Sequence, residues 1–322
     1  MRKKIGVVLF QLGGPDHPEA VEPFLYNLFC DPDIINFPLA FLARKPLAKL
    51  ISSTRARVVS EHYQAIGGAS PIRALTGQQA RALGDSLQPF ADVTVVVAMR
   101  YWHPSTEEAI AELKEIAFDG LILLPLYPQY SFATTRSSLK EWNRLYSSAG
   151  VPIHTIEKFY DHPSYIAAIV ERIEQALAGV IRRDELFFVF SAHGLPLALI
   201  EKGDPYQRQV EETVRLIREK GKWPNPHVLC YQSRVGPQEW LAPSLTDTIP
   251  RLAGEKVRRV LVIPLSFVTE HIETLHEIDI EAREQAESLG VEEFRMMPAL
   301  NDSPLFISAL TDLVLRAASL QV

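Results

Sequence analysis

Residues 121–127 read Leu-Ile-Leu-Leu-Pro-Leu-Tyr, an apolar run that reaches a proline and then an aromatic residue. Residues 261–267, Leu-Val-Ile-Pro-Leu-Ser-Phe, repeat that order in the second half of the chain. A strand-like segment and a helical segment precede each run, the strand-like segments being Val95–Arg100 and Val228–Arg234. Continuous apolar runs of this length are typical of strands buried on both faces of a parallel sheet. The repeated order predicts two similar α/β halves.

Short apolar runs alternate with amphipathic stretches along the rest of the chain, as they do in parallel sheets covered by helices. Strands are expected at 5–11, 93–99, 120–125, 186–191, 227–232 and 258–264. Helices are expected at 105–117, 164–178, 205–220 and 273–289, and another helix is expected to be capped near Thr76. Two open α/β sheets facing one another would form a cleft at the carboxyl ends of their strands, where such folds usually bind ligands.

The link at 150–163 contains Gly150, Pro152 and Pro163 and is the expected domain boundary. We therefore place an N-terminal lobe at 1–155 and a C-terminal lobe at 156–322. The last helix of the chain is allowed to pack back on the first lobe.

Composition narrows the class of protein. The chain has 322 residues, 47% of them hydrophobic, and a net charge of −6, which disfavours a nucleic-acid partner. Cys30 and Cys230 are each alone in their segments, so neither a disulfide framework nor a structural zinc site is indicated, and a reducing compartment fits.

Two apolar segments raise the question of whether the chain carries a membrane or targeting signal. The run Ile5–Phe10 is too short for a signal peptide and is better explained as a buried first strand. No stretch approaches the ~18 apolar residues of a transmembrane helix. The segment Phe37–Ala43, flanked by Arg44 and Lys45, is a candidate either for contact with a membrane surface or for a lip over a pocket.

Known nucleotide-binding and hydrolase motifs are absent: the chain has no GxGxxG, Walker A, GxSxG or HExxH sequence. The segment Ser191–Pro196 places His193 at the carboxyl end of an expected buried strand, with Gly194 allowing a sharp turn. His193 is therefore a candidate for chemistry or, equally, for holding the turn in place. A hydrolase using Ser191 and His193 is a minor alternative, since residues two apart in a strand do not easily make the nucleophile–base contact.

Three glutamates recur every four residues after the expected strand at 258–264. Glu273, Glu277 and Glu281 share a helix with an apolar stripe formed by Leu275, Ile278, Ala282, Ala286 and Leu289. Such a row is often a solvated face, although like charges four apart are mildly destabilising. Imidazole and carboxylate together suit a divalent first-row metal that is held transiently, because no thiolate is present to make a permanent site.

Two further segments offer aromatic side chains. Trp240 lies in Tyr231–Leu241, just beyond a glycine–proline turn, where it is either a core anchor or a contact for a flat ligand. Tyr127 and Tyr130 follow the strand at 120–125, and packing beneath the loop is the simpler interpretation of both.

Taken together, these segments resemble the ferrochelatases. The matching pieces run in that family's order over nearly the whole chain: Leu12–Pro15, Gly67–Ile72, Leu124–Ser131, Ser191–Pro196, Tyr231–Leu241 and Glu270–Leu275. The resemblance implies two Rossmann-like, chelatase-type lobes with the active-site cleft between them, and a porphyrin-covering lip at about 25–60. It implies a lyase that inserts Fe²⁺ into protoporphyrin IX to form protohaem, with release of two protons and without an organic cofactor.

Individual roles also follow from the resemblance. It places His193 and Glu273 at the catalytic, metal-insertion site, makes Glu277 and Glu281 a path for incoming metal, and implies a π-type turn near Glu273. The positions matching porphyrin contacts are Leu12, Leu25, Leu28, Arg55, Tyr127 and Trp240. Which of His193 and Glu273 accepts protons and which guides the metal stays open.

The resemblance has two informative departures. Some members ligate an iron–sulfur cluster through a cysteine-rich extension, whereas no cysteine follows Cys230 here, so no cluster is expected. The branch that metallates coproporphyrin has a tyrosine where Leu12 stands, so leucine favours the protoporphyrin branch. The expected location is the cytoplasm, with peripheral membrane contact as a candidate, and the chain is expected to be a monomer or a homodimer.

Two other interpretations of the sequence remain open. The first is a chelatase for coproporphyrin or for a sirohydrochlorin-type ring, which would favour further histidines and more basic residues. The second is a non-catalytic haem or metal carrier, which would retain its ligand tightly where an enzyme must release it.

Overall fold

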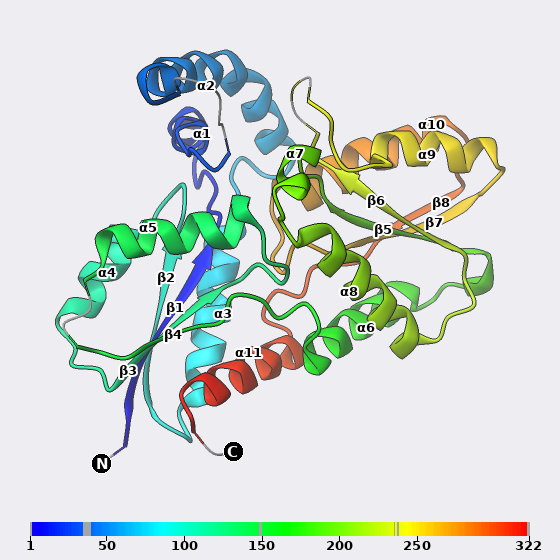
Figure 1. Cartoon of the computed structure of the whole chain (residues 1–322). Helices are drawn as coiled ribbons and strands as arrows, with labels where there is room; N and C mark the ends of the chain where they lie inside the picture. The colour runs from blue at the N-terminus through cyan, green and yellow to red at the C-terminus, as the bar shows by residue number, and fades with distance from the viewer. Residues whose placement is uncertain (1, 35–39, 148–149, 235, 237, 321–322) are drawn as a thin grey trace. The chain divides into compact units, whose positions relative to one another are not determined.

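The computed structural model describes residues 2–34, 40–147, 150–234, 236 and 238–320, and these form two compact units (Figure 1). Unit 1 consists of Met1–Tyr127, Ser131–Lys158 and Ile307–Val322. Unit 2 consists of Pro128–Tyr130 and Phe159–Phe306. Each unit is an α/β body with its own sheet, and each is described by itself below.

Unit 1 is built on a four-stranded parallel sheet in the order β2-β1-β3-β4. Its central strands are fully buried beyond Lys4, which explains their continuous apolar sequences. The strands are β1 (Lys4–Gln11), β2 (Asp92–Met99), β3 (Gly120–Pro125) and β4 (Ile153–Thr155).

Helices cover both faces of this sheet. Helices α4 (Thr106–Lys114) and α5 (Ser137–Leu145) bury Ile110 and Trp142 against Val8 and Phe10. Helix α3 (Ile72–Leu87) lies on the opposite face (Figure 1). The remaining elements of unit 1 are η1 (Pro18–Ala20), α1 (Val21–Phe29), α2 (Ala40–Ala65), the π-helical turn η2 (Phe132–Arg136) and most of α11 (Pro304–Ala317).

Unit 2 repeats the design, with a parallel sheet in the order β6-β5-β7-β8. Helices α9 and α10 cover one face and helices α6 and α8 the other (Figure 1). Its strands are β5 (Phe187–His193), β6 (His227–Gln232), β7 (Arg259–Pro264) and β8 (Glu293–Met296). Its helices are α6 (Pro163–Leu177), η3 (Arg183–Glu185), α7 (Leu197–Glu201), α8 (Tyr206–Gly221), α9 (Leu245–Gly254), the π-helix η4 (Glu273–Ala282) and α10 (Arg283–Ser288).

The prediction of two similar α/β halves is confirmed, because in both units the first strand lies between the second and the third. All six expected strands are present. Sequence analysis did not identify β4 and β8, which have only three and four residues. Strands this short carry too few residues to show a periodic pattern.

Two expectations about helices are wrong. Helix α3 begins at Ile72, and Thr76 lies inside it, where its hydroxyl donates to the Ile72 carbonyl at 2.6 Å instead of capping the first turn. The apolar stripe expected to end at Leu289 breaks, since Leu289 is 44% exposed. The cause is the end of the helix: α10 stops at Ser288, and Leu289 is its C-cap residue, whereas Ala282 and Ala286 of the same stripe are buried.

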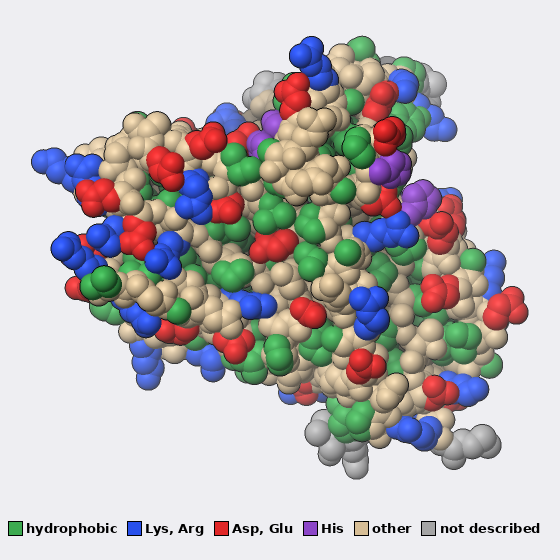
Figure 2. Space-filling view, turned by 180° about the vertical axis from the view of Figure 1, so that it is seen from behind, with side chains coloured by type: hydrophobic (Ala, Val, Ile, Leu, Met, Phe, Trp, Pro, Cys, Tyr) green, Lys and Arg blue, Asp and Glu red, His purple; other side chains and the backbone are tan. Residues whose placement is uncertain are grey.

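The surface carries mixed charge on the face shown in Figure 2, where Lys and Arg side chains alternate with Asp and Glu. Such a distribution lacks the broad basic face that binds nucleic acid. Among the described residues, every helix is either too short or too polar to cross a bilayer.

The core of unit 1 gives a direct test of the fold. Trp142 is fully buried and meets the ring of Phe10 edge-on, with ring centroids 5.6 Å apart. We expect Trp142→Ala to lower the free energy of unfolding by about 3–5 kcal/mol, because the lost indole leaves a cavity beside the sheet. Urea unfolding followed by circular dichroism measures this. Trp142→Phe, which keeps a ring, should lose less; equal losses would contradict the packing described.

Candidate active site

The carboxyl end of β5 carries the first candidate functional side chain. His193 is the last residue of this strand and pairs with Gln232 of β6. Gly194 follows, and its N–H donates to the Gln232 carbonyl at 2.7 Å. A Cβ atom at position 194 would lie 2.7 Å from that carbonyl oxygen and 3.3 Å from the Trp240 ring, so only glycine fits this approach. The turn therefore fixes where the His193 side chain leaves the sheet.

The second candidate functional side chain comes from η4, the π-helix that follows β7. Glu273 is its first residue, and its Oε2 atom lies 2.7 Å from Nδ1 of His193. The two side chains are 18% and 34% exposed, so the pair is shielded but reachable from solvent. The structure thus brings together His193 and Glu273, which lie far apart in the sequence.

Ser233 joins this pair to a second carboxylate. Its hydroxyl lies 2.7 Å from Glu273 Oε2 and 2.6 Å from Glu277 Oε2, and its N–H donates to Glu277 Oε1 at 2.6 Å. Ser233 adopts a left-handed backbone with φ of 65°, which turns both donors toward η4. Sequence analysis did not single out Ser233, although it lies within the segment Tyr231–Leu241. Its position directly after β6 was the available signal.

The protonation of the cluster follows from its contacts. Burial alone would lower the pKa of His193, but the attraction of the Glu273 carboxylate and the hydrogen bond to it raise that pKa above its ordinary value. Burial likewise opposes ionisation of Glu273, yet His193, His271 and Ser233 together lower its pKa. Both shifts favour the form of the pair in which His193 is protonated and Glu273 is ionised. Burial and the neighbouring Glu273 charge raise the pKa of Glu277 to about 7.

Glu281 lies apart from this cluster. Its side chain is 50% exposed, and its Oε1 atom is 3.5 Å from Nδ1 of His276, which is itself 8% exposed. His276 and Glu281 are five residues apart, the spacing that stacks side chains along a π-helix. Of the three glutamates expected on one face at four-residue spacing, Glu273 and Glu277 lie together beside Ser233. Glu281 pairs with His276 instead.

The hydrolase alternative finds no support in the geometry. The Ser191 hydroxyl donates to Gln232 Oε1 at 2.7 Å, and the His193 Nδ1 atom is engaged with Glu273. Among the hydrogen bonds of the described residues, none joins Ser191 to His193. A nucleophile–base pair requires that contact.

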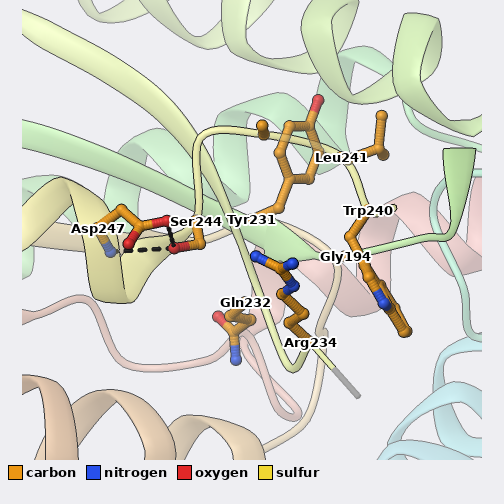
Figure 3. A pocket seen from close by; sticks show the side chains of 9 residues that line it. Gly194, Tyr231, Gln232, Arg234, Trp240, Leu241, Ser244 and Asp247 are labelled. Atoms are coloured by element: carbon orange, nitrogen blue, oxygen red, sulfur yellow. Dashed lines mark hydrogen bonds between the residues drawn. The ribbon is translucent and has the colours of Figure 1, made fainter. Parts of the chain in front are cut away.

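Trp240 lies at one end of a narrow cavity in unit 2 (Figure 3). In Figure 3, Arg234 lies in the middle of the lining residues and Asp247 at the end opposite Trp240. The cavity measures about 40 Å³, enough for a few water molecules and far too small for a tetrapyrrole. Trp240 is half-buried, and its indole N–H makes no hydrogen bond with the described residues. The lining residues are Gly194, Tyr231, Gln232, Arg234, Trp240, Leu241, Ala242, Ser244 and Asp247.

The other expected porphyrin contacts belong to unit 1. Leu12 follows β1 and Tyr127 follows β3, so both lie at the carboxyl edge of that sheet. Leu25 and Leu28 lie on α1, and Arg55 is an exposed residue of α2 whose guanidinium carbon is 5.9 Å from the centre of the Phe29 ring. Contacts between α1 and α2 hold this second group together.

Sequence analysis also missed a buried carboxylate near Tyr127. Asp31 accepts hydrogen bonds from Arg100 Nη2 at 2.8 Å, from the Tyr101 hydroxyl at 2.7 Å and from the Ser137 hydroxyl at 2.5 Å. Burial raises the pKa of Tyr127 to about 12, and the charges of Arg100 and Asp31 act on it in opposite directions. The network fixes the carboxyl edge of β2 beside Tyr127. A lone aspartate in the sequence gave no sign of it.

Comparison with solved structures identifies the class of fold. The chain matches CbiX, described as the terminal enzyme for biosynthesis of sirohaem in denitrifying bacteria, with a TM-score of 0.53 and 13% identity over 98% of this chain and 99% of that one. It matches SirB from Bacillus subtilis with a TM-score of 0.56 and 12% identity over 98% and 96% of the two chains. The fold is that of the chelatases.

Sequence comparison is more specific. The model of the ferrochelatase family matches residues 4–318. Ferrochelatases of Cyanothece sp. and Thermosynechococcus vestitus are 49% and 50% identical, over 98% of this chain and 82% and 83% of those proteins. The ferrochelatase of Gloeobacter violaceus is 50% identical over 97% of both chains.

The chain belongs to the ferrochelatase family. The family resemblance, the α/β fold and the assignment as a lyase are confirmed. The activity is the insertion of Fe²⁺, a substrate, into protoporphyrin IX in haem biosynthesis.

The cysteines give a test that is independent of activity. Cys230 is fully buried on β6, and burial raises the pKa of its thiol to about 12, whereas Cys30 is partly exposed. Because the thiolate is the reactive form, iodoacetamide at pH 8 should modify Cys30 well before Cys230 in the native protein. Peptide mass spectrometry over time measures both rates. Unfolding in guanidinium should make them similar, and equal rates in the native protein would contradict the burial.

Proposed function

We propose that His193 and Glu273 form the metal-insertion site of this ferrochelatase. The observation that carries the proposal is the 2.7 Å contact between His193 Nδ1 and Glu273 Oε2 at the carboxyl edge of the unit 2 sheet. Ligands of open α/β sheets usually bind at this edge. An imidazole and a carboxylate are also ligands that a divalent first-row metal accepts without being trapped by thiolate.

The pair matches the two requirements of the reaction. Metallation removes two pyrrole protons and passes Fe²⁺ into the ring, so it needs a proton acceptor and a ligand close together. Glu273 is ionised beside His193, so Glu273 can take a proton directly, whereas a protonated His193 can take one only after it has released its own. Metal entry would also expel the proton that His193 and Glu273 share, because ligands bind in their deprotonated form. We assign proton acceptance and metal guidance to the pair jointly.

Glu277 and Glu281 are proposed as the path by which Fe²⁺ reaches this pair. Glu277 is linked to Glu273 through Ser233, so a metal at Glu277 would already share a hydrogen-bonding partner with the site. Glu281 lies on the same π-helix and is half-exposed, which suits the outer end of such a path. Weak oxygen ligands in series allow a metal to be passed along without being retained.

The porphyrin contacts are proposed as Leu12, Leu25, Leu28, Arg55 and Tyr127 from unit 1 and Trp240 from unit 2. Leu12 and Tyr127 are supported by their place at the carboxyl edge of the unit 1 sheet. Trp240 is supported by its closeness to Gly194, the residue that follows His193. Flat aromatic and apolar side chains suit a macrocycle, and Arg55 suits its carboxylates.

The remaining attributes are proposed from the sequence. We propose that the enzyme holds no iron–sulfur cluster, that it works in the cytoplasm as a monomer or homodimer, and that it meets the membrane peripherally. Of the proposed membrane contact, Phe37–Ala43, residues 37–39 lie outside the described residues, and Ala40–Ala43 form the start of α2. Of the basic residues beside it, Lys49 is paired with Glu22 at 2.7 Å, which leaves Arg44 and Lys45 for anionic lipid.

Substitution at the pair tests the proposed site. His193→Ala and Glu273→Gln should each reduce turnover of Fe²⁺ and protoporphyrin IX by about 100-fold or more, because each removes a positioned acid–base or ligand group. Anaerobic insertion assays measure turnover, and quenching of porphyrin fluorescence measures binding, which should persist. The matched controls are His154→Ala and Glu292→Gln at exposed positions of unit 1 and unit 2. Near-normal insertion by either site variant would remove that residue from the site.

Leu12 gives a test of ring choice. Leucine offers apolar contact without a hydrogen bond, and burying the two extra carboxylates of coproporphyrin III without dedicated partners is costly. We expect kcat/KM to be higher for protoporphyrin IX than for coproporphyrin III under identical anaerobic conditions with lipid or detergent. A preference of about tenfold or more for coproporphyrin III would overturn the role of Leu12 and weaken the case for release at a membrane.

A further inference from the structure

The main chain of His193 lies where the sheet of unit 2 stops supplying hydrogen bonds. Strand β7 pairs with β5 as far as Ser191 and Pro264, and the Leu265 N–H donates to the Ser191 carbonyl at 2.9 Å. In a parallel ladder, alternate residues direct their N–H and C=O to the same neighbouring strand. The N–H and C=O of His193 therefore face the side on which β7 has already ended.

A continued β7 would have given His193 two partners, the Leu265 carbonyl and the Phe267 N–H. Instead, the Leu265 carbonyl accepts from the Tyr165 hydroxyl at 3.2 Å. Main-chain groups in a shielded site need other partners when a strand departs, because leaving them unpaired costs free energy. Two side chains supply those partners to His193.

Ser266 and Tyr206 take the places of the missing strand. The His193 N–H donates to Ser266 Oγ at 3.1 Å, and the His193 carbonyl accepts from the Tyr206 hydroxyl at 2.9 Å. The Tyr206 and Ser266 hydroxyl oxygens are 2.5 Å apart. Tyr206 is 5% exposed and begins α8, where its own N–H donates to Asp204 Oδ1 at 3.0 Å.

The direction of every bond in this group is fixed by counting protons. A carbonyl only accepts, so the single phenolic proton of Tyr206 goes to His193. The 2.5 Å contact must then be the Ser266 hydroxyl donating to the Tyr206 oxygen, and the Ser266 oxygen is left to accept from the His193 N–H. The three residues form a closed ring in which each donates once and accepts once, and such rings strengthen through mutual polarisation.

We infer that Ser266 and Tyr206 are positioning residues for the metal-insertion pair: their hydroxyl ring holds both peptide groups of His193 and so sets the approach of its imidazole to Glu273. This inference rests on the proposed role of His193. Neither residue touches the His193 ring through its hydroxyl, so neither is a catalytic group. Their contribution is to keep the strand end from shifting when metal and porphyrin enter.

The ring predicts a specific kinetic signature. Ser266→Ala and Tyr206→Phe should each lower kcat for Fe²⁺ insertion by about 10- to 100-fold, the scale of a misplaced reacting group, with KM for porphyrin changed by less than about twofold. The double variant should be no worse than the poorer single variant, because breaking the ring once already frees His193. Ser266→Thr keeps the hydroxyl and should restore most of kcat.

Tyr165→Phe is the matched control. Tyr165 is also buried, being 1% exposed against 5% for Tyr206, and its hydroxyl also donates to a main-chain carbonyl at the point where β7 leaves β5. It should lower the unfolding temperature about as much as Tyr206→Phe while leaving kcat unchanged. An equal loss of kcat in both variants, or additive losses in the double variant, would overturn the inference.

A second measurement separates this inference from the proposed function. Hydrogen–deuterium exchange of the His193 amide should accelerate by at least about tenfold in Ser266→Ala and in Tyr206→Phe and stay unchanged in Tyr165→Phe, since exchange requires the N–H to leave its acceptor. Unchanged exchange in the first two variants would overturn the ring itself. If the wild-type protein inserts no iron, the proposed function fails, whereas the exchange result still decides whether the ring exists.

Discussion

Main-chain hydrogen bonding at the carboxyl edge of the unit 2 sheet is the constraint on which the site depends. Within the sheet, neighbouring strands satisfy the peptide groups of β5, but the last bond from β7 is the one that the Leu265 N–H donates to the Ser191 carbonyl at 2.9 Å. The groups left over must be paired by other means, because they are shielded from water. On the β6 side, the Gly194 N–H donates to the Gln232 carbonyl through a close backbone approach. On the β7 side, Ser266 and Tyr206 pair with the N–H and the carbonyl of His193. His193 is therefore held on both sides at the place where the sheet no longer holds it.

The π-helical winding of η4 decides which acidic side chains meet this histidine. An α-helix would place Glu273, Glu277 and Glu281 along one gradually drifting row, whereas the wider π-turns pair His276 with Glu281 and leave Glu273 and Glu277 to share Ser233. Such turns are uncommon and tend to occur at functional sites. The outcome is one imidazole and two carboxylates within a single hydrogen-bonded cluster. This arrangement, with no cysteine in the cluster among the described residues, supports the proposal that it passes a metal on rather than keeping it.

The fold could be predicted from the sequence to the extent that elements were long and apolar. Buried strands such as β3 and β7 can be recognised by their continuous apolar runs, whereas β4 and β8 are too short to show a pattern. Thr76 resembles a helix cap in the sequence, although the helix has already begun before it. The pairing of His193 with Glu273 came from family resemblance, since residues from different strands meet only in the folded sheet. The sequence did not indicate roles for Ser233, Ser266 and Tyr206. Their hydrogen bonds depend on main-chain geometry, which the presence of a hydroxyl-bearing residue in a sequence does not reveal.

The repeated architecture places side chains of different chemistry at equivalent strand ends. In unit 1 the Leu126 N–H donates to the Phe10 carbonyl at 2.8 Å, just as the Leu265 N–H donates to the Ser191 carbonyl at 2.9 Å in unit 2. Leu12 and His193 each lie two residues beyond the residue whose carbonyl accepts this bond, and a glycine follows each of them. The Leu12 N–H is satisfied locally by the side chain of Gln11, so this position needs no ring of hydroxyls and carries an apolar side chain. Equivalent strand ends thus present a titratable group in one unit and a hydrophobic group in the other, the two kinds of contact that we propose for the metal and for the apolar face of the macrocycle.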